Sequence, residues 1–433
     1  MPKAPKLHTN NSDALWAKAT RLIPTGTQTF SKAPNQYVNG VAPKFIARGL
    51  GSHVWDLDDN EFIDYTTGLG PVILGYAYPR ITQAVTRQLE LGTVLPLAQP
   101  LEVELAELLV DLIPAAEMVR YGKNGSDVTA AAVRLARAVT SREKIAACGY
   151  HGWQDWFIGS TSRNAGVPKA IRGLTEHFTY NDIDSLKGIF DRSPGQVAAV
   201  IMEPVGFHEP VDGFLEEVRA LAHANGALLI YDEIITGFRM AIGGAQSYFG
   251  VTPDLATFGK GIANGMPLSA LVGRADLMAQ FEEVFFSGTF GGEALSLTAA
   301  IETVKELQER DALAHVWEMG GALRDGYNAI AAELGLAEVT ACIGYGFWPE
   351  FTFSETLGYA PALLQTLLVQ EITKRGVLTR APMFISYSHA TEDIAKTLAA
   401  FREGLEVVSE AIASGDIEAW LEGDVIGAVI RAS

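Results

Sequence analysis

Three features are scarce in this sequence, and each scarcity excludes a class of protein. The chain has two cysteines, Cys148 and Cys342, which form neither a disulfide framework nor a metal-binding spacing, so a reducing, cytoplasmic compartment is expected. The 33 basic residues are outnumbered by 51 acidic ones, and the net charge of −18 argues against nucleic-acid or anionic-membrane partners. Uninterrupted apolar stretches all fall short of the roughly 20 residues of a membrane span, and the polar N-terminus lacks the apolar core of a signal peptide.

What the sequence does contain is an alternation of short apolar runs and helical patterns, which begins near Met118. Helical patterns such as 128–140, 184–190 and 215–225 separate the runs. This alternation predicts an α/β fold with one mostly parallel central sheet covered by helices on both faces. The apolar runs are 144–148, 197–203, 227–231, 255–258 and 268–272.

The two ends of the chain have a different texture, and 433 residues allow two to three domains. Residues 1–67 include an alternating pattern at 45–65 that predicts a small antiparallel sheet. Residues 68–310 form the predicted large domain. Residues 311–433 are expected to form a smaller α+β domain together with the N-terminal segment, and one long helical segment is expected from about residue 299 to about 334.

The most informative stretch is the apolar run 227–231, because it ends abruptly at Asp232 and Glu233. A buried parallel strand delivers the residue at its carboxyl end into a cleft. A lysine, Lys260, follows Asp232 by 28 positions, between two glycines and directly after another apolar run. A carboxylate that keeps a pyridine nitrogen protonated and a lysine that holds an aldehyde are what a pyridoxal phosphate enzyme needs.

Simpler interpretations of these residues exist. A lysine in a glycine-rich turn is most often an ordinary surface residue. Two adjacent acids can serve a glycosidase, but neighbouring residues on a strand point to opposite faces, so Asp232 and Glu233 should not share one substrate. Glu233 is therefore expected to pair with a nearby base or with the backbone.

Several loops after predicted strands could complete a cofactor site. Asn124, Gly125 and Ser126 open a predicted helix, and there they form either an anion site or simply an ordinary helix cap. Tyr150 follows a predicted strand and could stack on a flat cofactor, whereas the neighbouring His151 is given a supporting role only. Three other candidates are a carboxylate that closes a strand, a residue in a small-residue loop and a possible cavity-lining tryptophan, namely Glu203, Thr289 and Trp153.

In their order and spacing, these motifs resemble the class III, fold-type I pyridoxal phosphate enzymes, and most closely the branch that contains glutamate-1-semialdehyde aminomutase. The resemblance extends from about Leu22 to the C-terminal helix. Its most specific part is the Asp-Glu…Gly-Phe-Arg run at 232–239 followed by Thr-Pro-Asp-Leu…Gly-Lys at 252–260.

The resemblance implies a role for each candidate residue. It implies that Lys260 forms the internal aldimine, that Asp232 pairs with the pyridine N–H and that Ile234 packs against the ring opposite Tyr150. It also implies a phosphate site at Asn124, Gly125 and Ser126, completed by Thr289 of the neighbouring subunit in a homodimer with shared active sites. Glu203 belongs to the same cofactor-binding set, and no metal is expected.

Substrate groups of the aminomutase are missing from the sequence. Lys32 stands where the aminomutase has a carboxylate-binding arginine, and segment 380–389 has no counterpart of its catalytic glutamate. We therefore expect an aminotransferase that moves an amino group from an amino donor to a carbonyl acceptor through a Lys260 aldimine and a pyridoxamine intermediate, with Lys32 and Trp153 near the substrate. The alternatives are an aminomutase or an amino-acid racemase with the same cofactor, or a non-catalytic binding protein that keeps the fold.

Overall fold

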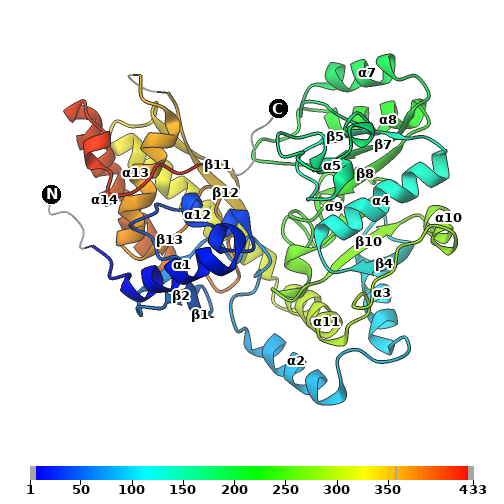
Figure 1. The fold of residues 1–433 in the computed structure, drawn as a ribbon, viewed down its shortest axis with the longest axis horizontal. Coiled ribbons are helices and arrows are strands. Elements are labelled where there is room, and N and C mark those ends of the chain that lie inside the picture. The colour runs from blue at the N-terminus through cyan, green and yellow to red at the C-terminus, as the bar shows by residue number, and fades with distance from the viewer. Residues whose placement is uncertain (1–5, 356–357, 428–433) are drawn as a thin grey trace. The chain divides into compact units, whose positions relative to one another are not determined.

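The structure is a computed structural model that describes residues 6–355 and 358–427 (Figure 1). The chain divides into two compact units. One unit joins the N-terminal segment through Tyr78 to the C-terminal segment from Ala314, and the other runs from Pro79 to Leu313. The predicted division after residues 67 and 310 stays a prediction of domain boundaries, since compact units and folding domains need not end at the same residue.

The Pro79–Leu313 unit is built on a seven-stranded sheet with strand order β4-β10-β9-β8-β7-β5-β6. Strands β5 to β9 pair in parallel, and β10 is antiparallel to both β4 and β9. The expected mostly parallel sheet is therefore confirmed, with one reversed strand that an apolar run alone does not reveal. The strands are β4 (Met118–Gly122), β5 (Lys144–Cys148), β6 (Thr175–His177), β7 (Val197–Met202), β8 (Leu228–Asp232), β9 (Leu255–Phe258) and β10 (Ser269–Gly273).

Helices cover this sheet, as the burial of its central strands requires. All six residues of β7 are buried, so both faces of that strand are covered. Helix α4 packs against β7, β9 and β10, and α8 packs against β8 (Figure 1). The helices of this unit are α2 (Pro79–Leu91), α3 (Pro100–Leu112), α4 (Gly125–Thr140), α5 (Asp155–Ile158), α6 (Lys169–Arg172), α7 (Ile183–Arg192), α8 (Phe214–Ala224), α9 (Ala245–Phe249), α10 (Ala275–Met278) and α11 (Ala294–Glu309), with 3-10 turns η4 (Lys260–Ala263) and η5 (Ala279–Glu282).

The segment 299–334 was expected to be one long helical segment, but it consists of two helices. The prediction of a continuous helix was therefore wrong. Helix α11 ends at Glu309 and α12 (Ala312–Glu333) begins after a break. Asp311 has a φ of 48°, a left-handed conformation that cannot continue a right-handed helix. The helical periodicity on both sides of the break hides it from a reading of the sequence.

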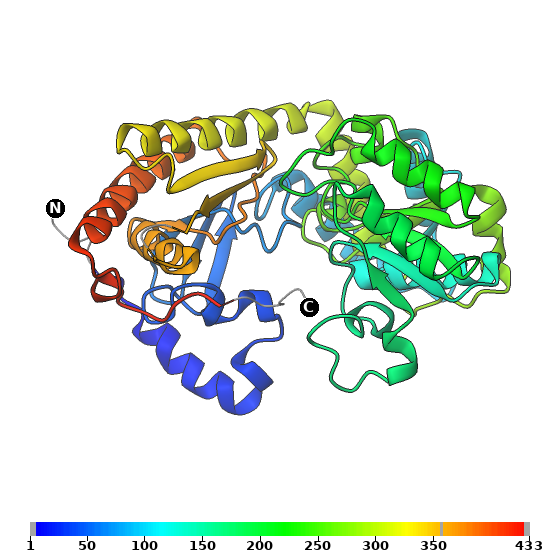
Figure 2. The same ribbon diagram turned by 90° about the horizontal axis from the view of Figure 1, so that it is seen from above.

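The other unit combines a four-stranded sheet, in the order β1-β2-β3-β13, with the two-stranded ribbon β11-β12. Helix α12 lies along this ribbon (Figure 2), where the Asn328 side chain bonds both the N–H and the carbonyl of Cys342. The elements are α1 (Asn10–Leu22), β1 (Ile46–Leu50), β2 (His53–Asp56), β3 (Glu61–Asp64), β11 (Thr340–Tyr345), β12 (Trp348–Phe353), α13 (Pro361–Lys374), β13 (Val377–Leu378) and α14 (Thr391–Ser414), with 3-10 turns η1 (Pro24–Gly26), η2 (Phe30–Lys32), η3 (Pro34–Gln36) and η6 (Glu418–Trp420).

One carboxylate in this second unit makes stability depend on pH. Burial raises the pKa of Glu350, on β12, from 4.5 to about 7. Between these values the folded chain holds a proton that the unfolded chain has released, so the free energy of unfolding falls as the pH rises through this window. We expect Glu350→Gln to be more stable than the parent by about 1–2 kcal/mol at about pH 8 and nearly equal to it at about pH 5, measured by urea unfolding.

The exposed Glu338, which precedes β11, provides the matched control for this experiment. Glu338→Gln should unfold with the pH dependence of the parent. Equal stabilisation by Glu350→Gln at both pH values would contradict the assignment.

Candidate active site

Asp232 occupies the carboxyl end of β8 and is only 4% exposed. Its Oδ1 accepts hydrogen bonds from the Ile234 N–H at 3.2 Å and the Thr257 hydroxyl at 3.3 Å. Its Oδ2 lies 2.7 Å from Nδ1 of His151, which is also buried. A buried carboxylate is costly unless it is hydrogen-bonded, and the neighbouring strand β9 contributes one of these partners through Thr257.

Lys260 is the first residue of η4, just after β9, the strand paired with β8. Its φ of 39° is a left-handed conformation that non-glycine residues rarely adopt, and such strain is concentrated at functional sites. Burial lowers the pKa of its amine, while the negative charges of Glu203 and Asp232 partly oppose that shift. The sheet thus brings the two residues that stand 28 positions apart in the sequence into one electrostatic environment.

Glu203 follows β7, so the ends of three adjacent strands supply Glu203, Asp232 and Lys260. Burial and the charge of Asp232 raise the pKa of Glu203, and its Oε2 accepts a hydrogen bond from the Tyr150 N–H at 3.0 Å. Gly149 permits this contact because its φ is +103° and a Cβ there would lie 2.3 Å from Glu203 Oε2.

The predicted phosphate loop forms the start of α4. Asn124 is the N-cap, and Asp127 completes a capping box by accepting from the Asn124 N–H at 2.8 Å. Amides in the first turn of a helix have no intrahelical partner, so those of Gly125 and Ser126 are suited to an anion. Ile234 packs on this turn, since a Cβ on Gly125 would lie 3.1 Å from Ile234 Cδ1.

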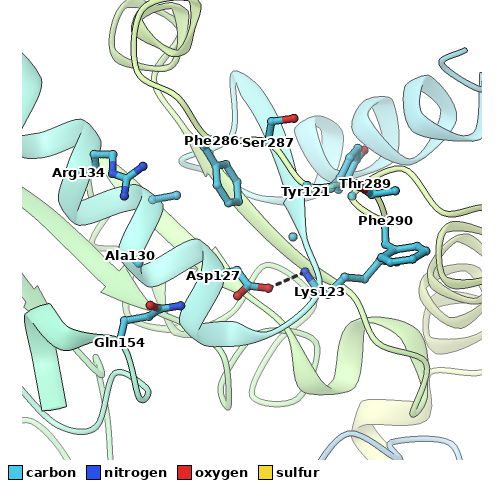
Figure 3. Close-up of a pocket in the computed structure, with 14 residues that line it drawn as sticks. Tyr121, Lys123, Asp127, Ala130, Arg134, Gln154, Phe286, Ser287, Thr289 and Phe290 are labelled. Atoms are coloured by element: carbon cyan, nitrogen blue, oxygen red, sulfur yellow. Dashed lines mark hydrogen bonds between the residues drawn. The ribbon is translucent and has the colours of Figure 1, made fainter. Parts of the chain in front are cut away.

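The remaining predicted residues belong to other segments of the chain. Trp153 is 65% exposed in the loop after Gly152, and Lys32 is exposed on η2, in the unit that contains both chain termini. Thr289 lines a cavity of about 360 Å³ together with Lys123, Asp127 and Arg134 (Figure 3). Among the described residues that line this cavity are neither Asp232 nor Lys260.

Sequence reasoning missed one contributor to the site and the partner of another. It gave His151 a supporting role but did not identify its contact with Asp232. It assigned no role to Arg239, which is fully buried and whose positive charge also lowers the pKa of Lys260. The signal for Arg239 was an arginine in an otherwise apolar Gly237-Phe238-Arg239 run.

Glu233 points away from this site, as expected from the pleat of a strand. It is fully buried, and its carboxylate accepts the N–H groups of Ala245 at 2.7 Å and Gln246 at 3.0 Å, in the first turn of α9. The hydroxyl of Thr236 also donates to it. The prediction that Glu233 pairs with a base or the backbone is confirmed, and it is the backbone.

The donor set fits pyridoxal phosphate. The first-turn amides of α4 suit a phosphate, the Asp232 carboxylate suits a ring N–H, and an amine with a lowered pKa suits an aldehyde. The Tyr150 ring is 52% exposed and contacts Phe157 in a T-shaped arrangement with ring centroids 5.6 Å apart, and an exposed aromatic ring is suited to stacking on a flat cofactor.

Comparison with known proteins identifies the family. The family model described as aminotransferase class-III matches residues 36–398. The chain belongs to this family. Glutamate-1-semialdehyde 2,1-aminomutase of Alkaliphilus oremlandii is 38% identical, with 91% of this chain and 98% of that protein covered. The 3-aminobutyryl-CoA aminotransferase of Cloacimonas acidaminovorans is 36% identical, with 94% and 100% covered.

Solved structures of the family share the fold. The internal aldimine form of the FumI protein from Sphingopyxis, with pyridoxal phosphate, has a TM-score of 0.86 and 31% identity, covering 93% of this chain and 97% of that one. An omega-transaminase from Sphaerobacter thermophilus has a TM-score of 0.84 and 26% identity, covering 92% and 97%. The expected family and the fold-type I architecture are thereby confirmed.

The tight loop that carries His151 yields a test of the site. Gly152 has a φ of +103°, and a Cβ there would lie 2.5 Å from Ser126 Cβ. We expect Gly152→Ala to lower the free energy of unfolding of the cofactor-free protein by roughly 1–3 kcal/mol from backbone strain, with a further loss from the clash, measured by urea titration. It should also displace Ser126 and weaken binding of pyridoxal phosphate.

Gly166→Ala is the control that separates backbone strain from steric clash. Gly166 has a φ of +86°, and a Cβ there would contact nothing within 4 Å. Gly166→Ala should show the strain alone and bind the cofactor like the parent. Equal effects of the two substitutions on cofactor binding would contradict the proposed contact with Ser126.

Proposed function

We propose that this protein is an aminotransferase that uses pyridoxal phosphate to move an amino group from an amino donor to a carbonyl acceptor. The observation that carries the proposal is the lysine with a lowered pKa, Lys260, in the electrostatic environment of Asp232 and Glu203 at the ends of adjacent strands. Membership of the class III aminotransferase family supports it. The buried free cysteines Cys148 and Cys342 support a cytoplasmic location, while no helix in the described ranges has the length and apolarity to cross a membrane.

Each part of the proposed cofactor site has a distinct task. Lys260 would hold the aldehyde end of the cofactor, Asp232 its ring N–H, and the first-turn amides of Gly125 and Ser126 its phosphate. Ile234 and Tyr150 would flank the ring, and Glu203 would hold the Tyr150 backbone in place. Pyridoxal phosphate supplies an aldehyde that takes up an amino group and a ring that stores the electron pair released when the neighbouring C–H bond breaks.

Lys260 is proposed to move the proton. Because burial and the charge of Arg239 lower the pKa of its amine, a larger fraction of Nζ is unprotonated near neutral pH than for an exposed lysine. The neutral Nζ can accept the proton of the donor's C–H bond and return it to another carbon. A base whose pKa lies nearer the working pH is more effective in both directions.

The second candidate function is an aminomutase, because relatives named glutamate-1-semialdehyde 2,1-aminomutase are 36–40% identical to this chain. Lys32, proposed to lie near the substrate, replaces the carboxylate-binding arginine expected of that enzyme, and a lysine cannot form the bidentate contact. Trp153 is the other proposed substrate residue. A racemase on the same cofactor is distinguished by the same experiment.

Turnover stoichiometry decides between these functions. An aminotransferase incubated with an amino donor alone should form about one product per active site, and continue only when a carbonyl acceptor is added. The measurements are the carbonyl product and the isomerised substrate formed by the cofactor-loaded enzyme across amines, α- and β-amino acids and amino sugars. Sustained turnover of any one substrate without acceptor would instead indicate an isomerase.

Substitution of Lys260 tests whether this residue carries the proton. Lys260→Ala should lower the rate by at least roughly 10²–10⁴-fold, the usual contribution of general acid–base catalysis. Lys305→Ala is the matched control, because Lys305 lies on α11 and pairs with Glu104 on the surface. Comparable turnover in Lys260→Ala and the parent would refute the role of Lys260.

We also propose a homodimer with shared active sites. In the Pro79–Leu313 unit, large apolar side chains are exposed on segments 89–103 and 285–290, and the second segment contains Thr289. Leu97 is 82% exposed and Phe285 is 76% exposed, which is unusual for such side chains unless a partner covers them. A second copy of this chain would cover this face and bring Thr289 to the neighbouring phosphate loop.

Charge placed on this face should prevent assembly. We expect Leu97→Asp combined with Phe285→Asp to run as a monomer in size-exclusion chromatography with light scattering and to retain less pyridoxal phosphate than the parent. Leu22→Asp is the matched control, since Leu22 is 69% exposed at the end of α1. A monomeric parent, or a monomeric variant with unchanged cofactor binding, would contradict shared sites.

A further inference from the structure

The segment that follows η6, residues 421–427, is anchored along one face of α13 by buried polar side chains. Thr366, Gln370 and Lys374 stand four residues apart on this helix, so they form one stripe, and each is at most 6% exposed. Buried polar groups are costly unless they are hydrogen-bonded, and the segment supplies partners to all three. We call residues 421–427 the strap.

The strap is held on this stripe at two points. The Thr366 hydroxyl accepts the Ile426 N–H at 3.1 Å. The Gln370 side chain accepts the Glu422 N–H at 2.6 Å, and the Lys374 amine donates to the Glu422 carboxylate. The strap is therefore fixed in place along α13 at both Glu422 and Ile426.

The strap also pairs with segment 35–39, near the other end of the chain (Figure 2). The Asp424 N–H donates to the Asn39 carbonyl at 3.1 Å, and the Asp424 carboxylate accepts from the Asn39 side-chain amide at 2.7 Å. The Gly427 N–H donates to the Asn35 carbonyl at 3.0 Å. Because residue 424 pairs with residue 39 and residue 427 with residue 35, the two segments run antiparallel.

Gln36 connects the strap to the interior of this unit. Its side-chain amide donates to the Gly427 carbonyl at 2.7 Å, and its side-chain oxygen accepts from the Arg380 guanidinium at 3.1 Å. Gln36 is only 4% exposed, so both contacts are shielded from water. The strap thus holds a buried side chain of segment 35–39 as well as its backbone.

Two consecutive 3-10 turns connect Gln36 to Lys32. Turn η2 ends at Lys32, and the N–H of the next residue, Ala33, donates to the Phe30 carbonyl at 3.1 Å. The Ala33 carbonyl in turn accepts the Gln36 N–H at 2.9 Å in η3. Because the Lys32 side chain is exposed, the place of its amine depends on these turns rather than on packing.

We propose that the strap is a positioning element for Lys32 and so sets the affinity for the amino donor. This inference rests on the proposed function, in which Lys32 lies near the substrate. A binding group contributes fully only when it is held in the productive geometry, and a small displacement lowers that contribution. The proposed cofactor residues Asp232 and Lys260 belong to the other compact unit, so we expect the strap to affect donor binding and not cofactor binding.

Gly423→Ala tests whether the strap holds the loop that carries Lys32. A Cβ at Gly423 would lie 2.2 Å from the Asn39 carbonyl oxygen, so the strap and segment 35–39 must move apart. In hydrogen-exchange mass spectrometry of the full-length protein, we expect the amides of residues 33–39 to exchange about 2- to 10-fold faster than in the parent, the range for one lost hydrogen bond.

Gly427→Ala is the matched control on the same strap. A Cβ at Gly427 would meet no described atom within 4 Å, and neither glycine has a left-handed φ, so the two substitutions differ in the clash alone. Unchanged exchange in Gly423→Ala, or equal changes in the two variants, would overturn the proposal.

The effect on the donor is tested by kinetics of the cofactor-loaded enzyme with its best amino donor. Gly423→Ala should raise KM by about 2- to 10-fold, while kcat and the Kd of pyridoxal phosphate stay close to those of the parent. Lys32→Ala should also raise KM. Because the strap acts through Lys32, adding Gly423→Ala to Lys32→Ala should raise KM little further.

A purely structural role predicts a different pattern. Gly423→Ala would then lower thermal stability and leave KM unchanged, or its effect on KM would add in full to that of Lys32→Ala. Either result, or an unchanged KM in Lys32→Ala, would overturn the proposal. A parent without turnover on any donor and acceptor would instead contradict the proposed function, and hydrogen exchange would still decide whether the strap holds the loop.

Discussion

The burial of the Asp232 carboxylate is the constraint on which the site depends. A carboxylate that is 4% exposed must be hydrogen-bonded or paired, and the partners come from three separate segments of the chain. Thr257 reaches it from β9, the Ile234 N–H from the turn after β8, and His151 from the loop after β5. Because these segments meet only when the parallel strands are in register, satisfying this one charge also brings the other proposed cofactor residues together.

Glycine makes the approach of these segments possible. Gly149 and Gly152 flank Tyr150 and His151, and both have a φ of +103°. A side chain at Gly149 would meet the Glu203 carboxylate, and one at Gly152 would meet Ser126. The loop after β5 can therefore lie between Glu203 and the start of α4 only because neither position carries a Cβ.

From the sequence, the residues of this site could be predicted better than the contacts between them. Asp232, Glu203 and Tyr150 were recognisable because each follows a short apolar run, and the carboxyl ends of parallel strands meet at one edge of a sheet. The reversal of β10 was not recognisable, since burial on both faces gives the same apolar run in either direction. The break at Asp311 depends on one left-handed residue between two helical patterns. The partner of His151 could not be predicted either, because it lies 81 residues away and no periodicity links the two positions.

In two loops, the one after β8 and the one after β5, the side chains of neighbouring residues point to different surroundings. The structural cause differs between the two loops. In Asp232 and Glu233 the pleat of the strand separates the side chains, so that one acid faces the proposed cofactor site and the other binds the first turn of α9. In Tyr150 and His151 the flanking glycines do the same, leaving the tyrosine ring 52% exposed and the imidazole 1% exposed. Each pair thus supplies one group to the site and one group that holds the site together. The imidazole of the second pair contacts the carboxylate of the first at 2.7 Å, which connects the two loops directly.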